Sequence, residues 1–316
     1  MLFRSLAGST AATASILTGV GPDRHGIRAD LLDPIRTDAP MLAEIMRGNG
    51  YTTAGMYSWI NFEPAYSGLN RGFQFYEDST VNLPRYLADA QTQALAATYR
   101  RIKSYLALPG AADIDLAKID SVDAQLDGKA DITASAAARW LERRRTDPFF
   151  LWVHFRDPHA PYGATTRSDS ATCSDCSDGT LESLQRIRTG ALDVSAPEIN
   201  RIVKSYDDEV AFVDRQLDVL LRELSDLGLD SNTVVIVAGA YGQSFGDHGA
   251  WLEGSSVYNA EIQVPLLIRY PGVLPAGVVV TQPTSLVDIA PTVLQITGAS
   301  PPSTMVGRSI VLARNE

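Results

Sequence analysis

The feature of this sequence that most constrains its fold is the alternation of short, continuous apolar runs with helical patterns. Apolar runs without alternating polar positions are typical of strands buried on both faces, as in a parallel sheet covered by helices. The predicted strands are residues 52–57, 149–155, 233–237 and 265–270. Together with the helical segments between them, they predict an α/β fold with a mainly parallel central sheet between helical layers.

Several segments carry the apolar periodicity of a helix packed against a sheet. They are residues 41–47, 87–106, 132–145 and 208–224. The acidic residues 207–209 are interpreted as the start of the last helix, where negative charge suits the helix dipole. By contrast, residues 163–189 are rich in Ser, Thr, Asp and Gly and predict a long polar surface loop.

The charge balance and the length of the apolar runs exclude two classes of partner. Lys and Arg number 27 against 37 Asp and Glu, which gives a net charge of -10. A protein that binds nucleic-acid phosphates normally has the opposite sign, so no nucleic-acid partner is predicted. The apolar runs fall far short of the ~20 residues that a membrane-spanning helix needs, so no membrane span is predicted.

The two cysteines, Cys173 and Cys176, form a single Cys-x-x-Cys motif inside the predicted polar loop. A zinc ribbon needs a second pair, and a redox motif needs a helix start within a βαβ unit. We therefore interpret them as a loop thiol pair or a local disulfide. The first residues show no signal-peptide pattern, and the sequence predicts neither a compartment nor an oligomeric state.

Ser9 stands just before an Ala-rich segment with helical character. A hydroxyl at such a helix N-terminus faces converging backbone N–H groups, which can hold an oxyanion and favour an alkoxide nucleophile. The same position suits an ordinary N-cap, which is the commoner role of serine there. The local sequence leaves both interpretations open.

His159 follows the predicted strand 149–155, between Pro158 and Pro161. Loops at the carboxyl ends of parallel strands are where such sheets bind ligands. A histidine fixed there can donate to an anion or act as a general acid, and the alternative is a histidine packed within the proline-rich turn. His154 lies within the strand and is interpreted as structural.

Six short segments, taken in order, resemble signatures of the sulfatase family within the alkaline phosphatase superfamily. They are residues 17–19, 50–54, 157–162, 206–210 with Asp214, 264–272 and 287–292. The resemblance covers almost the whole chain, so it is identified as a member of that family with one sulfatase-type domain over residues 1–316. An alkaline-phosphatase-like fold is what the resemblance implies.

The resemblance also implies a chemistry. Family members hydrolyse sulfate, phosphate or phosphonate esters at a divalent cation such as Ca²⁺ or Mg²⁺, which offsets the charge that develops at the nucleophile. By position in the motif, Ser9 takes the place of the nucleophile, Thr13 a substrate-binding position, and His159 contacts the ester oxygens. The partner implied is a small-molecule sulfate or phosphate ester.

This sequence departs from the family at several of these positions. Residues 9–13 read Ser-Thr-Ala-Ala-Thr and lack the proline and arginine of the formylglycine motif, whereas Ser-x-Ala-Ala resembles the alkaline phosphatase segment with its plain serine. Ala240 and Tyr241 replace the metal-binding Asp-His. Alanine cannot ligate a cation, and tyrosine is a poor ligand for a hard cation at neutral pH.

Further polar groups of the family are also replaced. Residues 57–60 lose the lysine and histidine of a Gly-Lys-Trp-His segment, and the lysine expected before Tyr258 is missing, with Glu253 nearby. Asp247 and His248 correspond to a pair that lies beyond the site in the family. The family's first strand, with its aspartate pair, is expected upstream of Met1, and its smaller C-terminal sheet beyond the end of this chain.

No metal ligand and no cofactor are therefore predicted for this chain, which resembles a degenerate or truncated family member. Two functions remain open. One is a metal-dependent hydrolase of sulfate or phosphate monoesters, with its missing ligands supplied from outside the chain. The other is a non-catalytic member that binds an anionic or sugar ligand, or a protein, through the cleft that corresponds to the family's active site.

Overall fold

The computed structural model describes residues 9–28, 33–62, 64–78, 130–144, 146–160, 162, 181–254 and 256–311. The predicted helix over residues 87–106 lies outside these ranges, as do Cys173 and Cys176. Among the described residues, no helix combines the length and apolar character that crossing a membrane requires.

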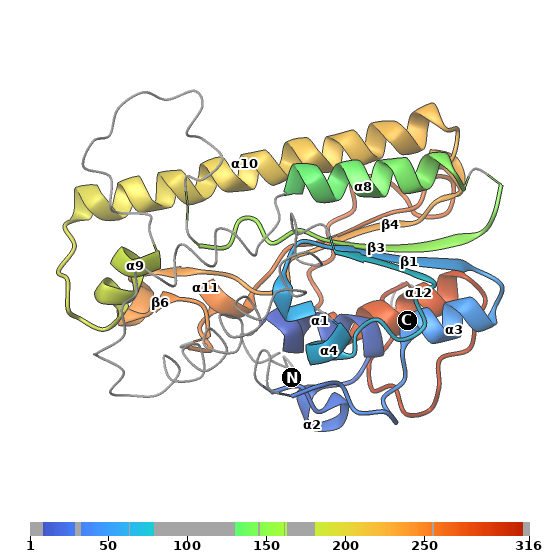
Figure 1. The fold of residues 1–316 in the computed structure, drawn as a ribbon, viewed down its shortest axis with the longest axis horizontal. Helices are drawn as coiled ribbons and strands as arrows, with labels where there is room; N and C mark the ends of the chain where they lie inside the picture. The colour runs from blue at the N-terminus through green and yellow to red at the C-terminus, as the bar shows by residue number, and fades with distance from the viewer. Residues whose placement is uncertain are drawn as a thin grey trace, which may run out of the picture.

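A parallel sheet forms the centre of the molecule (Figure 1). Its strand order is β2 (Phe75–Asp78), β1 (Thr52–Tyr57) and β3 (Phe149–His154), and both pairs are parallel. β4 (Val235–Ala238) pairs with β7 (Leu266–Arg269) in the antiparallel direction. The predicted α/β class with a parallel sheet is confirmed, and each of the four predicted strands is present.

The middle strand of this sheet has little room at its centre. A Cβ added to Gly55 of β1 would lie 2.7 Å from the Tyr76 ring of β2, so glycine lets this aromatic side chain lie against the strand. Tyr76 in turn packs against Tyr57, with ring centroids 4.8 Å apart. Tyr57 and Tyr76 belong to an aromatic core cluster together with Phe150 and Trp152 of β3.

Helices cover both faces of the sheet (Figure 1). α8 (Ala130–Glu142) and α10 (Ala196–Asp226) lie on one face, where Trp140, Leu141 and Leu224 pack on Ala54 and Met56. α1 (Ser9–Thr18), α3 (Leu42–Gly48) and α12 (Ile289–Ile296) lie on the other. The predicted helical layers are therefore confirmed.

Shorter elements complete the described chain. The helices are α2 (Pro22–His25), α4 (Pro64–Ser67), α9 (Leu181–Arg188) and α11 (Asn259–Ile262), and the 3₁₀ turns are η1 (Ile60–Phe62), η3 (Asp230–Asn232), η4 (Asp247–Gly249) and η5 (Leu286–Asp288). β5 (Ser244–Phe245) and β6 (Trp251–Leu252) form an antiparallel pair. Glu253 directly follows β6, at the end of this short hairpin.

α10 begins much earlier than the sequence predicted, at Ala196 instead of residue 208. Its first turn carries a capping box, in which the Ser195 N–H donates to the Glu198 carboxylate over 2.7 Å. Residues 207–209 therefore lie in the middle of the helix, and their interpretation as helix-starting charges was wrong. Glu209 is instead buried, with 2% of its surface exposed.

The predicted polar loop over residues 163–189 is also corrected at its end, because α9 occupies Leu181–Arg188. Leu184 and Ile187 of this helix are buried in a cluster with Tyr162 and Trp251. These apolar positions, three residues apart, are a helical signal that the polar composition of the segment obscured. Residues 163–180 lie outside the described ranges.

Candidate functional site

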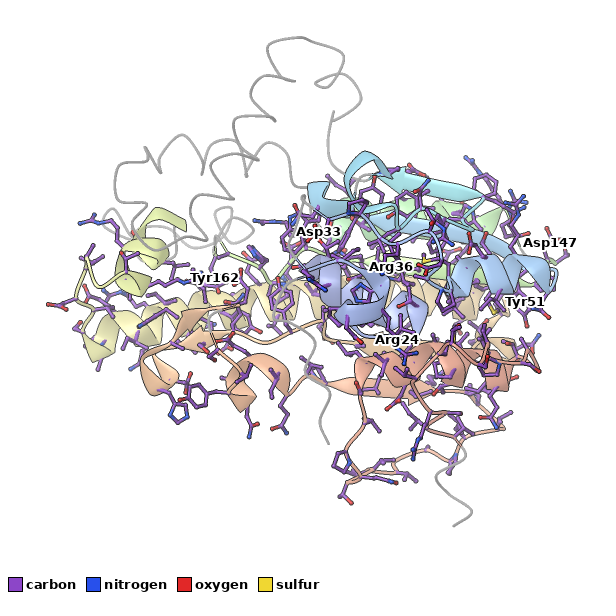
Figure 2. All side chains as sticks on the ribbon, turned by 90° about the horizontal axis from the view of Figure 1, so that it is seen from below. Arg24, Asp33, Arg36, Tyr51, Asp147 and Tyr162 are labelled. Atoms are coloured by element: carbon purple, nitrogen blue, oxygen red, sulfur yellow. The ribbon has the colours of Figure 1, made fainter. Side chains whose placement is uncertain are left out.

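The candidate site lies where the parallel strands end. Tyr51 and Asp147, which precede β1 and β3, lie together at one end of the molecule, and Tyr162, which follows β3, lies away from them (Figure 2). The segments after β1, β3, β4 and β6 carry the polar side chains of the site, and Ser9 begins α1. The carboxyl ends of parallel strands are the usual position of a ligand site in such sheets.

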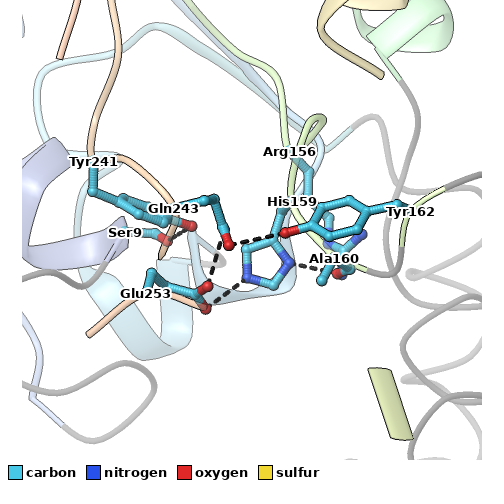
Figure 3. A network of polar contacts seen from close by, with 8 residues as sticks. All are labelled: Ser9, Arg156, His159, Ala160, Tyr162, Tyr241, Gln243 and Glu253. Carbon is cyan, nitrogen blue, oxygen red and sulfur yellow. Dashed lines mark hydrogen bonds and ion pairs between the residues drawn. The ribbon is translucent and has the colours of Figure 1, made fainter. Parts of the chain in front are cut away.

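Ser9 is the first residue of α1 and is almost completely buried. Its Oγ donates a hydrogen bond to the Tyr241 Oη over 2.8 Å, joining the start of this helix to the loop after β4 (Figure 3). By the resemblance, Tyr241 is predicted to stand in place of part of the family's metal-binding pair, and Ser9 at the nucleophile position. The contact shows that the Ser9 hydroxyl is bonded to a phenol.

The loop that carries Tyr241 and Gln243 is fixed through the glycine between them. The Gly242 N–H donates to the Glu261 carbonyl over 2.8 Å. A Cβ at Gly242 would lie only 2.0 Å from the Ala260 carbonyl oxygen, so no larger residue fits without moving the backbone. This close approach to α11 positions both neighbouring side chains.

His159 is held between two oxygen acceptors. Its Nε2 lies 3.1 Å from the Glu253 Oε1, and its Nδ1 lies 2.6 Å from the Ala160 carbonyl oxygen (Figure 3). A carboxylate and a carbonyl can only accept, so the doubly protonated imidazolium satisfies both contacts. Neither ring nitrogen is then available as a base.

Glu253 is the partner that fixes this arrangement. Its second oxygen, Oε2, accepts from the Gln243 Nε2 over 3.0 Å, and the Tyr162 hydroxyl lies 2.9 Å from the Gln243 Oε1. Burial raises the pKa of the Glu253 carboxyl, but the His159 charge and the hydrogen bonds of His159 and Gln243 together hold it at about 2. The Glu253 carboxyl is therefore ionised at neutral pH.

The loops after β1 and β3 support His159 from the other side. The Trp59 ring meets the His159 ring edge-on, with centroids 4.8 Å apart. The Arg156 backbone N–H donates to the Ser58 Oγ over 2.8 Å, and the Arg156 guanidinium donates to the Ala160 carbonyl over 2.7 Å. His159 is therefore held rigidly by side-chain packing and by the backbone contact.

His154 and Asp157 serve structural purposes in this region. The His154 ring packs on Phe62 with centroids 4.3 Å apart, and burial lowers its pKa to about 3, so it is neutral at ordinary pH. The Asp157 Oδ2 accepts from the Ala130 N–H at the start of α8 over 2.8 Å, while burial raises the pKa of this carboxyl. These contacts agree with the interpretation of His154 as a structural residue.

The described residues do not fit the divalent cation that the fold family implies. No group of three or more His, Cys, Asp or Glu side chains in this part of the chain is placed to hold a metal ion. Ala240 has no ligating group, and Tyr241 is engaged with Ser9. Asp247 and His248 lie in η4, where the His248 ring stacks on Tyr258 with centroids 4.0 Å apart.

Some residues of this region were predicted from the sequence, and others were not. The structure brings Ser9, through Tyr241, next to the contacts that hold His159 (Figure 3). Thr13 lies one helical turn after Ser9 and is buried, and its role at a substrate stays a prediction. Gln243 and Tyr162 were not singled out, although both lie inside segments that were noted for other reasons.

Comparison with known proteins shows which family the chain belongs to. The model of the Sulfatase family matches residues 2–299. The chain belongs to the sulfatase family. It is 32% identical over 167 residues to an endo-4-O-sulfatase of Bacteroides thetaiotaomicron, an alignment that covers 51% of this chain and 32% of the relative. It is 27% identical over 313 residues to arylsulfatase G of Mus musculus, which covers 92% of this chain and 56% of that protein.

This sulfatase-family chain thus spans between about a third and a little over half of the length of these two relatives. Among solved structures, it is similar to a phosphonate monoester hydrolase from Silicibacter pomeroyi, with a TM-score of 0.65 and 22% identity over 98% of this chain and 67% of the other. A protein solved with its substrate D-glucosamine-2-N,6-O-disulfate has a TM-score of 0.66 and 18% identity, covering 97% of this chain and 70% of that one. These similarities show the fold.

Proposed function

We propose that the site around Ser9 and His159 binds a sulfate or phosphate monoester, and that this chain does not hydrolyse the ester by a metal-dependent route. The observation that carries the proposal is the hydrogen bond of 2.8 Å between the Ser9 hydroxyl and the Tyr241 phenol. It places a phenol against the nucleophile position, where the family resemblance implies groups that hold a cation.

The contacts of Ser9 explain why we expect no nucleophile. A serine hydroxyl becomes a strong nucleophile when a base removes its proton or a cation stabilises its alkoxide. Phenols hold their proton near neutral pH and do not serve as the base. His159 does not serve either, because both of its ring nitrogens face oxygen acceptors.

Ester binding is supported by what remains at the site and by the relatives. The start of α1 and the His159 Nε2–H are donors of the kind that bind ester oxygens. The endo-4-O-sulfatase and arylsulfatase G are named for sulfate esters, and one similar structure contains a disulfated glucosamine as its substrate. A sulfated sugar is therefore a reasonable first ligand class to test.

The test compares turnover with binding. The chain and a Ser9→Ala variant are mixed with 4-nitrophenyl sulfate, phosphate and phosphonate esters, with a chelator or with added Ca²⁺, Mg²⁺ or Zn²⁺. We expect no metal-dependent release of 4-nitrophenol, and ester binding that calorimetry detects. Metal-dependent turnover that disappears in Ser9→Ala would contradict the proposal and indicate a working hydrolase.

A further inference from the structure

We propose that Glu253 is the specificity-determining residue of this site, favouring a singly charged sulfate monoester over a doubly charged phosphate monoester. The inference rests on the proposed function, because it assumes that an ester reaches His159. It adds a selection by charge, which neither the family membership nor the relatives' names assign to this residue.

An ester can contact His159 at one of its two ring nitrogens. The Nδ1 is bonded to the Ala160 carbonyl, which leaves the Nε2 as the donor that faces the side chains of the site. The Glu253 Oε1 already lies 3.1 Å from this nitrogen. An ester oxygen that approaches the Nε2 must therefore lie beside the Glu253 carboxylate or displace it.

Glu253 is firmly held. One of its oxygens is bonded to His159 and the other to Gln243, and its side chain is only 22% exposed. Two hydrogen bonds at low exposure keep the carboxylate in place when a ligand arrives. Its negative charge is thus a fixed part of the site.

An ester that approaches the Nε2 meets a negative charge. The Glu253 carboxylate faces this nitrogen and is ionised, because the pKa of its carboxyl is held at about 2. A sulfate monoester carries one negative charge at neutral pH, whereas a phosphate monoester carries close to two above its second pKa, near 6. The additional charge of the phosphate ester meets the Glu253 carboxylate at short range.

A purely structural ion pair would behave differently. Removing such a pair would lower the stability of the fold but would leave the ratio of the two ester affinities unchanged. The charge argument instead predicts a change in that ratio. At the dielectric constants typical of partly buried sites, one unit charge a few ångströms away changes an affinity by roughly tenfold or more.

The experiment is calorimetric titration of the full chain with 4-nitrophenyl sulfate and 4-nitrophenyl phosphate at about pH 8, where the phosphate ester is doubly charged. The variants are Glu253→Gln, Glu253→Asp and Glu142→Gln, the last an exposed residue at the end of α8 with the same change of charge. We expect the wild type to prefer the sulfate ester. Glu253→Gln should raise the affinity for the phosphate ester more than the affinity for the sulfate ester. The ratio of the two affinities should change by at least about tenfold. The other two variants should keep the wild-type ratio.

A second measurement needs no variant and covers the case in which Glu253→Gln does not fold. Raising the salt concentration from about 0.01 M to about 1 M shortens the electrostatic screening length from ~30 Å to ~3 Å. It should therefore reduce the ratio of the sulfate-ester affinity to the phosphate-ester affinity of the wild type. An equal affinity ratio in the wild type and Glu253→Gln would overturn the role of Glu253. A wild-type affinity ratio that salt does not change would do the same. Either result would leave the proposed function standing. Absence of binding of either ester to any variant would overturn the proposed function and this inference together.

Discussion

Lowering the pH should remove a defined part of the stability of this chain through Glu253. The pKa of its carboxyl is held at about 2, against an ordinary value of 4.5, because the contacts of His159 and Gln243 outweigh the effect of burial. A carboxyl whose pKa is lower in the folded state stabilises the fold at pH values above its unfolded pKa. This contribution is lost as the pH falls from about 4.5 through about 2.

The magnitude follows from the size of the shift. Each pKa unit corresponds to about 1.4 kcal/mol, so a shift of this size corresponds to at most about 3 kcal/mol of unfolding free energy. Because Glu253 and His159 are coupled, the pKa shift is a property of the pair. We therefore expect the variant Glu253→Gln to lose about 1–3 kcal/mol of unfolding free energy at neutral pH. Removing one partner of a part-buried ion pair also leaves the other without its counter-charge.

The assay is urea unfolding of the wild type and Glu253→Gln between about pH 7 and pH 2. Other carboxyls also titrate in this range, so the quantity to follow is the difference between the two proteins. We expect the wild type to be more stable at pH 7 and the difference to shrink as the pH falls below about 4.5. A difference that stays constant over the whole range would refute the assignment of the lowered pKa to Glu253.

Three further predictions concern the neighbouring loop and the metal. Tyr241→Phe removes the partner of the Ser9 hydroxyl and should cost about 1 kcal/mol of unfolding free energy, measured by urea unfolding, and an unchanged value would argue against this contact. Gly242→Ala should lower the melting temperature markedly and weaken ester binding, because the new Cβ would lie 2.0 Å from the Ala260 carbonyl oxygen. The matched control is Gly48→Ala, whose new Cβ would meet nothing within 4 Å and should leave both quantities nearly unchanged. A chelator should leave the melting temperature unchanged, since the described residues contain no metal-holding cluster, and a clear drop would reveal a bound cation.

Much of the fold could be predicted because the signals are local. Continuous apolar runs identified β1 with its observed boundaries, and β3 to within one residue. The antiparallel pairing of β4 with β7 was not foreseen, because an apolar run carries no information about the direction of its neighbour. The first turns of α10 were missed since the capping box of Ser195 and Glu198 precedes a stretch with a largely polar face.

The site was less predictable, because its contacts join residues that are far apart in the sequence. His159 and Glu253 are 94 positions apart, and Tyr162 and Gln243 are 81 apart. Motif spacing predicted Ser9 and His159 as site residues, and it predicted that Ala240 and Tyr241 stand in place of the metal-binding pair. No local pattern indicates that a glutamate after a short hairpin bonds to a histidine after a central strand.

The hydrogen bonds of Gln243 and His159 both end on Glu253, and this has a consequence for Tyr162. The Tyr162 hydroxyl donates to the oxygen of the Gln243 amide, so the nitrogen end of the same amide faces Glu253. An amide that turned over would present its oxygen to the carboxylate, and two acceptors would then repel each other. Tyr162 thus sets the polarity of the amide, and through it helps to keep the Glu253 carboxylate on His159.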